Sequence, residues 1–516
     1  MVRILWVDDE IDLLKPYVLF LETKGYAFSL AIDGNEALDI LAEEKVDIVF
    51  LDENMPGLSG LEVLTIIKER YPALPIIMIT KSEEEQIMEQ AIGSKISDYL
   101  IKPVNPNQIL LTLKKHLDTK RLVSEKSTMS YQQEFRQIGM KLQDRLDWKE
   151  WVDIYKKLVY WELNLAESND VGLFEILKQQ KQEANNLFSK YYQQNYVDWI
   201  TKKEEDVPLL SHTLLKEKLF PVLKESDKSN FLIIIDNFRF DQWKALQTQI
   251  EQYFRVENED IYYSIIPTTT QYARNALLSG LMPSEIKKTY PDLWIDEDEE
   301  GMKNQNEYTF FQKNLTRHNI NIKTSYHKVL NMNYGKKMID NLPNLLQNKL
   351  NIIVYNFIDM LSHARTDSAL VRELAEDEKA YRSVTKTWFE HSPLLEVIKF
   401  LSSKKVNIFI TTDHGSVKIN NPIKIRSTKD ASVNLRYKVG KLMDYNTKEV
   451  FDVKNPEDIF LPRLHISSPY IFARSNDFFA YPTNYNHYVQ YYINTFQHGG
   501  ISMEEIMIPF IKLTNK

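Results

Sequence analysis

The sequence predicts an α/β protein in three parts, with a helical segment between two domains that each contain a parallel sheet. Short apolar runs alternate with helical patterns over residues 1–118, and this alternation returns over residues 206–516. Residues 119–205 instead carry apolar residues at helical spacing, with two glycines and no proline. A chain of 516 residues is long enough for about three domains.

The first part, residues 1–118, is predicted to form a doubly wound parallel sheet. Its clearest strands are RILWV, DIVFLD, PIIMIT and DYLIKP, and segments such as GNEALDILAEE and GLEVLTIIKERY have helical spacing. Strands that alternate with helices in this way build parallel sheets covered by helices on both faces. The carboxyl ends of these strands are therefore expected to meet at one edge.

The second part, residues 119–205, is predicted to form a small helical bundle. Segments such as YQQEFRQIGMKLQDRL and VGLFEILKQQKQEANNLFSKYY repeat apolar residues with helical periodicity. Large aromatic side chains in such a segment usually belong to its core. The tryptophans expected in that core are Trp148, Trp151, Trp161 and Trp199.

The third part, residues 206–516, is predicted to form a second α/β domain with a ligand site at one edge of its sheet. FLIIID, YYSIIPTTT, NIIVYNFID and VNIFITTDHG have the pattern of buried strands that end in polar residues, and ligands of open parallel sheets bind at those ends. The polar stretch 284–350 is expected to be an inserted cap or a set of loops. Its aromatic residues and lysines, such as Tyr326, Lys328 and Tyr334, indicate either a nucleic-acid contact or a solvated insertion.

Composition excludes several classes of function. There is no cysteine, which rules out disulfides, thiol nucleophiles and zinc ribbons. The net charge of −8 and the lack of a helix-turn-helix pattern disfavour sequence-specific DNA binding. The first ten residues read as a strand rather than a signal peptide, and no apolar run is long enough for membrane insertion. We therefore expect a cytoplasmic protein.

Six side chains suited to phosphoryl transfer stand at or just after the strand ends of the first part. They are Asp8, Asp9, Asp52, Thr80, Tyr99 and Lys102. Three carboxylates that meet at one edge repel one another, and hard oxygen ligands of this kind suit Mg²⁺. Asp52 is then expected to accept a phosphoryl group as an acyl phosphate, whose oxygens Lys102 neutralises. Thr80 is expected to bond to the phosphoryl group, and Tyr99 to change rotamer as a switch.

These residues, with Met55-Pro56-Gly57 after Asp52 and Pro103 after Lys102, stand in the order found in receivers of two-component systems. Over its whole length the first part resembles the response-regulator receiver family. The resemblance implies a flavodoxin-like fold, phosphorylation of Asp52, and the backbone carbonyl of Asn54 as a further magnesium ligand.

A second set of metal-ligating side chains comes from separate segments of the third part. Asp236 ends FLIIID, an Asp-x-x-x-His pair follows NIIVYNF, an Asp-His pair lies in TTDHG, and a histidine lies in QHGG. The full set is Asp236, Asp359, His363, Asp413, His414 and His498. Mixed imidazole and carboxylate ligands favour zinc, although manganese also fits them.

The candidate nucleophile is Thr270, the last of three threonines in IPTTTQYARNALLSG. It stands where a strand ends and a helical stretch begins, and the positive end of a helix favours an incoming phosphate. Thr268 and Thr269 remain alternatives, and Thr270 is preferred on spacing alone. Arg274 and Asn275 follow on the same stretch, either as contacts to substrate phosphate or as ordinary helix residues.

Together these segments resemble the PglZ domain of the alkaline phosphatase superfamily over residues 206–516. The resemblance implies two zinc ions per chain, with Asp236, Thr270, Asp413 and His414 at one and Asp359, His363 and His498 at the other. It also implies a phosphothreonine intermediate. The spacing of ten residues from Thr270 to Gly280 is similar to that of phosphodiesterase branches of the superfamily.

The order of receiver, helical linker and PglZ domain resembles a family of response regulators that control type IX secretion and gliding. This likeness implies a sensor histidine kinase as phosphodonor, a homodimer that forms on phosphorylation, and phosphodiesterase output on an oligonucleotide, linear or cyclic. The alternative is a non-enzymatic signalling adaptor, whose phosphorylation-controlled dimer binds a sigma factor or a secretion component.

Overall fold

The computed structural model describes residues 2–72, 74–81, 96–113, 115–116, 119–166, 171–201, 206–428, 431–465 and 468–516. The chain divides into two compact units, Met1–Gln132 and Gln133–Lys516. Among the described residues, no helix combines the length and the apolar character that crossing a bilayer requires.

The first unit contains a five-stranded parallel sheet in the order β2-β1-β3-β4-β5. The strands are β1 (Val2–Val7), β2 (Tyr26–Ala31), β3 (Ile48–Asp52), β4 (Ile76–Thr80) and β5 (Asp98–Ile101), and helices described beside them are α1 (Ile11–Glu22), α2 (Gly34–Glu43), α3 (Gly60–Arg70) and α5 (Pro106–Leu113). Ile4 and Trp6 enter one apolar cluster, whereas Leu5 and Val7 enter another. The sheet is thus buried on both faces, which confirms the predicted doubly wound, flavodoxin-like fold.

A helical segment follows, and most of it belongs to the second unit. Its helices are α6 (Thr119–Lys141), which spans both units, α7 (Trp148–Ala166) and α8 (Val171–Thr201). Trp151, Trp161 and Trp199 are buried as predicted. The prediction was wrong for Trp148, which is only half-buried and whose indole N–H donates to Asp206. The ring of Trp199 packs edge-on against Tyr263, which lies on a strand of the following domain. The predicted aromatic core of the helices therefore continues into the domain that carries the second candidate site.

The central sheet of the second unit has six strands in the order β7-β20-β10-β6-β9-β8. They are β6 (Ser229–Ile235), β7 (Phe254–Tyr263), β8 (Thr324–Val329), β9 (Leu350–Tyr355), β10 (Val406–Thr411) and β20 (Met507–Asn515). Strands β8, β9, β6 and β10 are parallel, and β20 runs antiparallel between β10 and β7. The carboxyl ends of β6, β9, β10 and β7 therefore meet at one edge.

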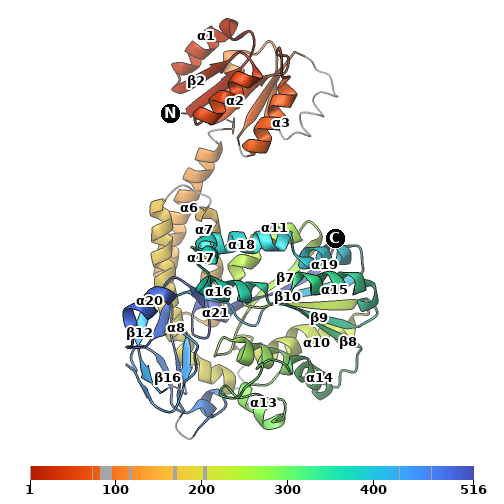
Figure 1. The fold of residues 1–516 in the computed structure, drawn as a ribbon, viewed down its shortest axis with the longest axis vertical. Coiled ribbons are helices and arrows are strands. Elements are labelled where there is room, and N and C mark those ends of the chain that lie inside the picture. The colour runs from red at the N-terminus through yellow and green to blue at the C-terminus, as the bar shows by residue number, and fades with distance from the viewer. Residues whose placement is uncertain are drawn as a thin grey trace. The chain divides into compact units, whose positions relative to one another are not determined.

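Helices cover both faces of this sheet, as the α/β prediction requires. On one side lie α11 (Phe240–Ile250), α15 (Met332–Leu345), α18 (Glu378–Glu390) and α19 (Pro393–Ser402), and on the other lie α10 (Phe220–Glu225) and α14 (Glu307–Arg317) (Figure 1). Short helices complete the connections: α9 (Ser211–Leu214), η2 (Leu215–Leu219), η3 (Thr270–Arg274), α12 (Asn275–Ser279), α13 (Pro283–Thr289), α16 (Phe357–Asp367) and α17 (Ala369–Leu374).

A smaller β-rich region is inserted between β10 and β20. Its elements are β11 (Val417–Lys418), β12 (Asn421–Lys424), β13 (Arg426–Ser427), β14 (Tyr437–Val439), β15 (Met443–Asp444), β16 (Phe451–Val453), η4 (Pro456–Ile459), β17 (Tyr470–Phe472), β18 (Asp477–Ala480), α20 (Tyr485–Tyr492), β19 (Phe496–Gln497) and α21 (Met503–Ile506). Its strands form small separate sheets of two or three strands. This region carries His498 back to the edge of the central sheet.

The expectation of a cap or loops over residues 284–350 was wrong. This stretch contains α14, α15 and β8, and β8 pairs in parallel with β9 as an outer strand of the central sheet. The segment is polar because a strand at a sheet edge buries only part of its surface. Tyr326 and Lys328 on that strand both bond to Glu307 inside the domain, so neither is a free contact for nucleic acid.

Candidate functional site

The first candidate site lies at the carboxyl edge of the receiver sheet. Asp8, Asp9 and Asp52 place oxygen atoms within 4.8 Å of one another. Nζ of Lys102 lies 2.9 Å from Asp8 and 2.8 Å from Asp52. Burial raises the pKa of Asp52, helped by the charges of Asp8 and Asp9 and opposed by Lys102. Three acidic side chains around one lysine suit a divalent cation and an incoming phosphoryl group.

The other predicted receiver residues lie around this cluster. Thr80 ends β4 and is buried, and its hydroxyl donates to the carboxylate of Glu53. Asn54 is exposed two residues after Asp52. Tyr99 on β5 has 38% of its surface exposed, so the aromatic side chain has room to change rotamer, which its proposed switch role requires.

The second candidate site lies at the carboxyl edge of the central sheet in the second unit. Asp236 directly follows β6, and Asp413 and His414 follow β10. Asp359 and His363 lie on α16, just after β9, and one turn apart. Because parallel strands end at the same edge, residues far apart in the sequence converge there.

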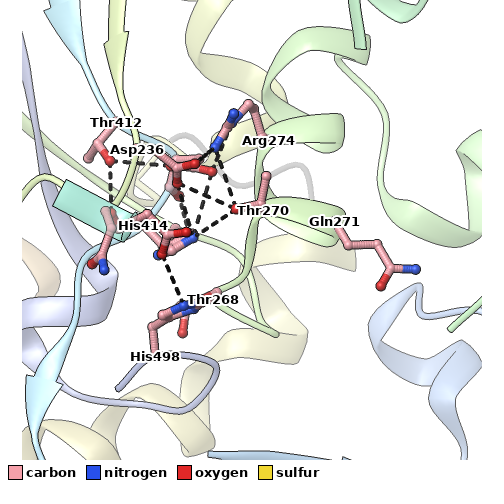
Figure 2. A network of polar contacts seen from close by, with 12 residues as sticks. Asp236, Thr268, Thr270, Gln271, Arg274, Thr412, His414 and His498 are labelled. Carbon is pink, nitrogen blue, oxygen red and sulfur yellow. Dashed lines mark hydrogen bonds and ion pairs between the residues drawn. The ribbon is translucent and has the colours of Figure 1, made fainter. Parts of the chain in front are cut away.

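Asp236, Asp413 and His414 form one group whose ligand atoms lie within 4.8 Å of one another, and all three residues are buried. The hydroxyl of Thr270 lies 3.4 Å from Oδ1 of Asp236 and 3.5 Å from Nε2 of His414. Figure 2 shows Thr270 facing Asp236, His414 and Arg274, whereas Gln271 points away from them. Four of the predicted residues thus lie together, with the candidate nucleophile among them.

Asp359, His363 and His498 form a second group within the same 4.8 Å limit. Nε2 of His498 lies 3.4 Å from Asp359, and Nε2 of His363 lies 3.5 Å from it. The rings of His414 and His498 stack with centroids 4.3 Å apart. This stacking joins the two groups into one continuous set, with the exposed His363 at its solvent side.

Hydrogen bonds orient the two inner histidines as metal ligands. Nδ1 of His414 lies 3.2 Å from the carbonyl of Gly415, and Nδ1 of His498 lies 3.0 Å from the carbonyl of Thr268. A carbonyl accepts only from a protonated nitrogen, so each Nδ1 carries a proton and each Nε2 is the nitrogen that faces the carboxylates. Oδ1 of Asp359 is buried, and within the described part of the chain its polar contact is the one with Nε2 of His498 at 3.4 Å. This donor set fits two divalent cations.

Burial and mutual contacts shift the pKa values of the acids and histidines in this set. Burial raises the pKa of Asp236 to about 7, and burial lowers the pKa of His414 to about 3. Burial alone would lower the pKa of His498, but its contact with Asp359 raises the pKa to about 9. The same contact holds the pKa of Asp359 well below its usual range, against the effect of burial. A bound cation would replace the proton of His498.

The stability of the chelated protein is expected to fall between pH 7 and pH 9. The folded-state pKa of His498 is about 9, above about 6.5 for an unfolded histidine. The protonated imidazole therefore adds its full contribution to the free energy of unfolding below pH ~6.5, and this contribution is lost as the pH rises through 9. The expected loss is on the order of 3 kcal/mol, measured by denaturant unfolding across this range. His498→Gln should remove the trend, and a trend unchanged in that variant would contradict the assignment.

Arg274 lies inside this ligand set, which the sequence did not indicate. It is fully buried, its guanidinium pairs with Asp236, and its Nε lies 3.0 Å from Asp413. Its Nη2 also lies 3.4 Å from the hydroxyl of Thr270. Arg274 therefore holds the candidate ligands and the candidate nucleophile in place, rather than standing free for a substrate phosphate.

Asn275, the other residue considered for substrate contact, is buried as well. Its amide nitrogen donates to the backbone carbonyls of Gln271 and Lys303. Both donors are thus used within the protein, and they stabilise the π-helical turn η3 that begins at Thr270. Asn275 has no donor left for a phosphoryl oxygen.

The three consecutive threonines have different surroundings. The hydroxyl of Thr268 bonds to the backbone of Gly499 and Gly500, on the loop that carries His498. Thr269 is buried, and its hydroxyl makes no hydrogen bond to any described residue. Of the three threonines, Thr270 is the one whose hydroxyl lies beside Asp236 and His414. Geometry therefore favours Thr270 over its two neighbours.

Helix α8 holds the loop that carries His498. The hydrogen bonds between them join residues more than 300 positions apart in the sequence. The side chain of Asn185 accepts from the backbone N–H of Met503 at 2.7 Å and donates to Glu504 at 2.8 Å. Ser189 donates to the carbonyl of Ile501 at 2.9 Å. The helical segment is thus bonded directly to the second ligand group's loop, and sequence patterns carry no signal for such contacts.

We expect Asn185→Leu to lower the free energy of unfolding of the protein by about 2–3 kcal/mol, because it leaves the buried N–H of Met503 and Oε2 of the buried Glu504 without a hydrogen-bond partner. Asn186→Leu is the matched control, since Asn186 is the exposed neighbour on the same helix. Denaturant unfolding of both variants measures the difference. Equal stabilities would show that these bonds do not hold the loop.

A fourth acidic group lies beside this contact and is already neutralised. Glu162, Asp241 and Glu378 place oxygens within 4.8 Å of one another. Arg239 pairs with Asp241 and Glu378, and Arg382 pairs with Glu162 and Asp241. Nζ of Lys181 on α8 lies 2.7 Å from Glu162. Three cations thus compensate the three acids in an ion-pair network, and the group is not a cation site.

Three protein families match consecutive segments of the chain. The response regulator receiver domain matches residues 4–114, the PorX response regulator linker domain matches 121–200, and the BREX system PglZ alkaline phosphatase-like domain matches 214–513. The last match covers more than half of the chain. The three matches together give the domain order of PorX-type regulators.

Individual relatives match the receiver segment. The transcriptional regulatory protein ResD of Bacillus subtilis is 38% identical over 112 residues, which are 22% of this chain and 46% of ResD. The chain thus spans less than half the length of this curated relative. The solved chemotaxis protein CheY4 of Vibrio cholerae is 30% identical, covers 23% of this chain and 99% of its own, and has a TM-score of 0.22. TrrA of Thermotoga maritima, solved with Mg²⁺ and BeF, is 32% identical over 23% of this chain and 100% of its own, with a TM-score of 0.21.

Proposed function

The chain belongs to the PglZ alkaline phosphatase-like family and joins that domain to a response-regulator receiver, and we propose that its output is metal-dependent hydrolysis of phosphodiesters. One observation carries the proposal. The hydroxyl of Thr270 lies 3.4–3.5 Å from Asp236, His414 and Arg274, beside the buried group of candidate metal ligands Asp236, Asp413 and His414. A hydroxyl so placed is an activated nucleophile rather than a structural threonine.

The candidate ligands divide into two groups, and each group would hold one divalent cation. Asp236, Asp413 and His414 with Thr270 would hold one, and Asp359, His363 and His498 the other. Zinc is the favoured ion because the ligands mix imidazole nitrogen with carboxylate oxygen. When bound, two such ions would supply Lewis acidity, which would lower the pKa of the Thr270 hydroxyl and offset the charge of the phosphoryl oxygens.

The chain's own residues perform the remaining tasks. Oγ1 of Thr270 forms a bond to phosphorus while the bond from phosphorus to the leaving alcohol breaks, and the alcohol leaves with a proton. Water then attacks the phosphothreonine, which releases the phosphomonoester and restores the hydroxyl. Arg274 keeps Thr270 and Asp236 aligned, and the backbone carbonyls of Thr268 and Gly415 keep both imidazole rings oriented.

The proposed regulation starts at Asp52. A sensor histidine kinase donates the phosphoryl group, with Mg²⁺ held by Asp8, Asp9 and Asp52 and by the backbone carbonyl of Asn54. Thr80, Tyr99 and Lys102 respond to it, and two chains then associate. The PorX-type domain order supports a role in type IX secretion and gliding, a cytoplasmic location and an oligonucleotide substrate. Beryllofluoride with Mg²⁺ should increase the mass of the protein in solution, whereas an unchanged mass would contradict the dimerisation step.

The direct test is hydrolysis of bis-p-nitrophenyl phosphate by the zinc-loaded protein, compared with p-nitrophenyl phosphate. We expect the diester to be hydrolysed faster and chelation to abolish the activity. Faster hydrolysis of the monoester would show that the enzyme is a phosphomonoesterase and not a phosphodiesterase. Absence of turnover on both esters and on short oligonucleotides, with zinc bound and with beryllofluoride present, would favour the adaptor function, in which a sigma factor or secretion component binds the dimer.

A further inference from the structure

The cleft at Thr270 extends well beyond the candidate metal ligands. Its volume is about 550 Å³, which lies in the range of roughly 300–1,000 Å³ that is typical of small-molecule sites. A single phosphoryl group fills only a small part of such a cleft. The remaining lining includes Glu297, Lys303, Asn304, Val433 and Asn434.

The charge of this lining argues against further phosphate groups. Lys303 is the only lysine among the described residues that line the cleft, and no arginine is among them. Its ammonium already donates to the backbone carbonyls of Asp296 and Glu299. Two carboxylates, Glu297 and Asp359, line the same cleft. The part beyond the metal ligands therefore suits an uncharged group with hydrogen-bond donors, and not a polyphosphate.

Glu297 is held in a fixed orientation toward this space. Its Oε1 accepts from the hydroxyl of Tyr437 at 2.8 Å, and its Oε2 accepts from the hydroxyl of Tyr272 at 3.2 Å. Both tyrosines are buried, and Tyr272 lies two residues after Thr270. A carboxylate has about four acceptor positions, so each oxygen keeps one for a ligand. Burial raises the pKa of Glu297 because it removes water from the carboxylate, which favours a donor from a ligand there.

Two amides and one apolar side chain complete the surface around Glu297. Oδ1 of Asn434 accepts from two backbone N–H groups, which leaves its amide nitrogen for a ligand. Asn304 makes no side-chain hydrogen bond to any residue that the structure describes. Val433 has 91% of its surface exposed and offers an apolar face. We call Glu297, Asn304, Val433 and Asn434 the Glu297 wall.

We infer that the Glu297 wall binds a nucleobase and selects bases that carry an exocyclic amino group. Carboxylates read the amino group of cytosine in protein–nucleic acid complexes, and a base also needs amide partners and an apolar surface for its face. Uracil presents a carbonyl oxygen where cytosine presents the amino group, so Glu297 would repel it. This inference rests on the proposed function, since it assigns the specificity of the same site.

The test compares the dinucleotides CpC and UpU, whose bases differ at the amino position. We expect kcat/KM for CpC to exceed that for UpU by roughly tenfold or more. In Glu297→Gln the amide can present a donor to uracil, so the preference should fall below about threefold or reverse. Glu300→Gln is the matched control, because Glu300 is an exposed glutamate of the same segment and makes no described side-chain contact. Thermal unfolding checks that Glu297→Gln remains folded.

The outcomes separate this inference from the function on which it rests. If the protein hydrolyses bis-p-nitrophenyl phosphate but shows no preference for CpC, or if Glu297→Gln keeps the preference, the inference is wrong and the phosphodiesterase stands. If no ester is hydrolysed, calorimetric binding of cytidine and uridine monophosphates to the zinc-loaded protein decides. Tighter binding of the cytidine compound supports the Glu297 wall, and equal affinities overturn it.

Discussion

Thr270→Ala is expected to lower the turnover of phosphodiesters by a factor between about 10³ and 10⁶, the range seen when an enzyme loses its nucleophile. The hydroxyl removed is the one that lies 3.4 Å from Asp236 and 3.5 Å from His414. Its loss leaves all three imidazole ligands and all three carboxylates in place, so bound zinc should remain. Turnover of bis-p-nitrophenyl phosphate and zinc content, measured on the same sample, check both statements.

Thr270→Ser is the matched control for this variant. Serine keeps the oxygen and loses only the methyl group, so most of the activity should return. Mass spectrometry of protein quenched during turnover of bis-p-nitrophenyl phosphate should find Thr270 with a p-nitrophenyl phosphoryl group in the wild type and no such adduct in the alanine variant. Turnover retained in the alanine variant would show that another group is the nucleophile. Thr269 lines the same cleft and would be examined first.

Asp52→Asn is expected to abolish incorporation of a phosphoryl group from acetyl phosphate. Asp52 ends β3, is almost fully buried, and bonds to Lys102 at 2.8 Å, so its carboxylate is positioned and partly desolvated. An amide is not a nucleophile toward phosphorus and does not bind Mg²⁺ as a carboxylate does. Intact-protein mass spectrometry after incubation with Mg²⁺ and acetyl phosphate measures the effect.

Asp39→Asn serves as the control for this second variant. Asp39 is an exposed aspartate of α2 with no described side-chain contact, so its replacement should leave incorporation intact. Incorporation into Asp52→Asn equal to that of the wild type would place the acceptor elsewhere in the receiver. Loss of incorporation in both variants would indicate a folding defect rather than loss of the acceptor.

Local patterns were sufficient to predict the parallel strands of both sheets and the positions of the ligand candidates, but not the antiparallel strand β20. Asp236 and Asp413 follow buried strands, and parallel strands end at one edge, so their convergence with Asp359 follows from topology. The strand pattern likewise predicted the doubly wound parallel sheet of the first unit. These features depend on periodicity along one segment, which a single sequence displays directly.

Contacts between distant segments were beyond the reach of the sequence. Arg274 follows the nucleophile on the same helical turn, and only the fold shows that its guanidinium reaches Asp236 and Asp413. The bond from Asn185 to Glu504 joins residues 319 positions apart. Strand β8 was missed because an edge strand that exposes part of its surface lacks the continuous apolar run of its neighbours.

The central claim is that two adjoining groups of side chains hold two divalent cations, and metal analysis tests it most directly. Inductively coupled plasma mass spectrometry of protein purified without chelator should find about two zinc ions per chain. The variant Asp359→Asn/His498→Gln should retain about one, because the group of Asp236, Asp413 and His414 stays intact. Wild-type protein without bound metal, even after incubation with zinc or manganese, would contradict the account.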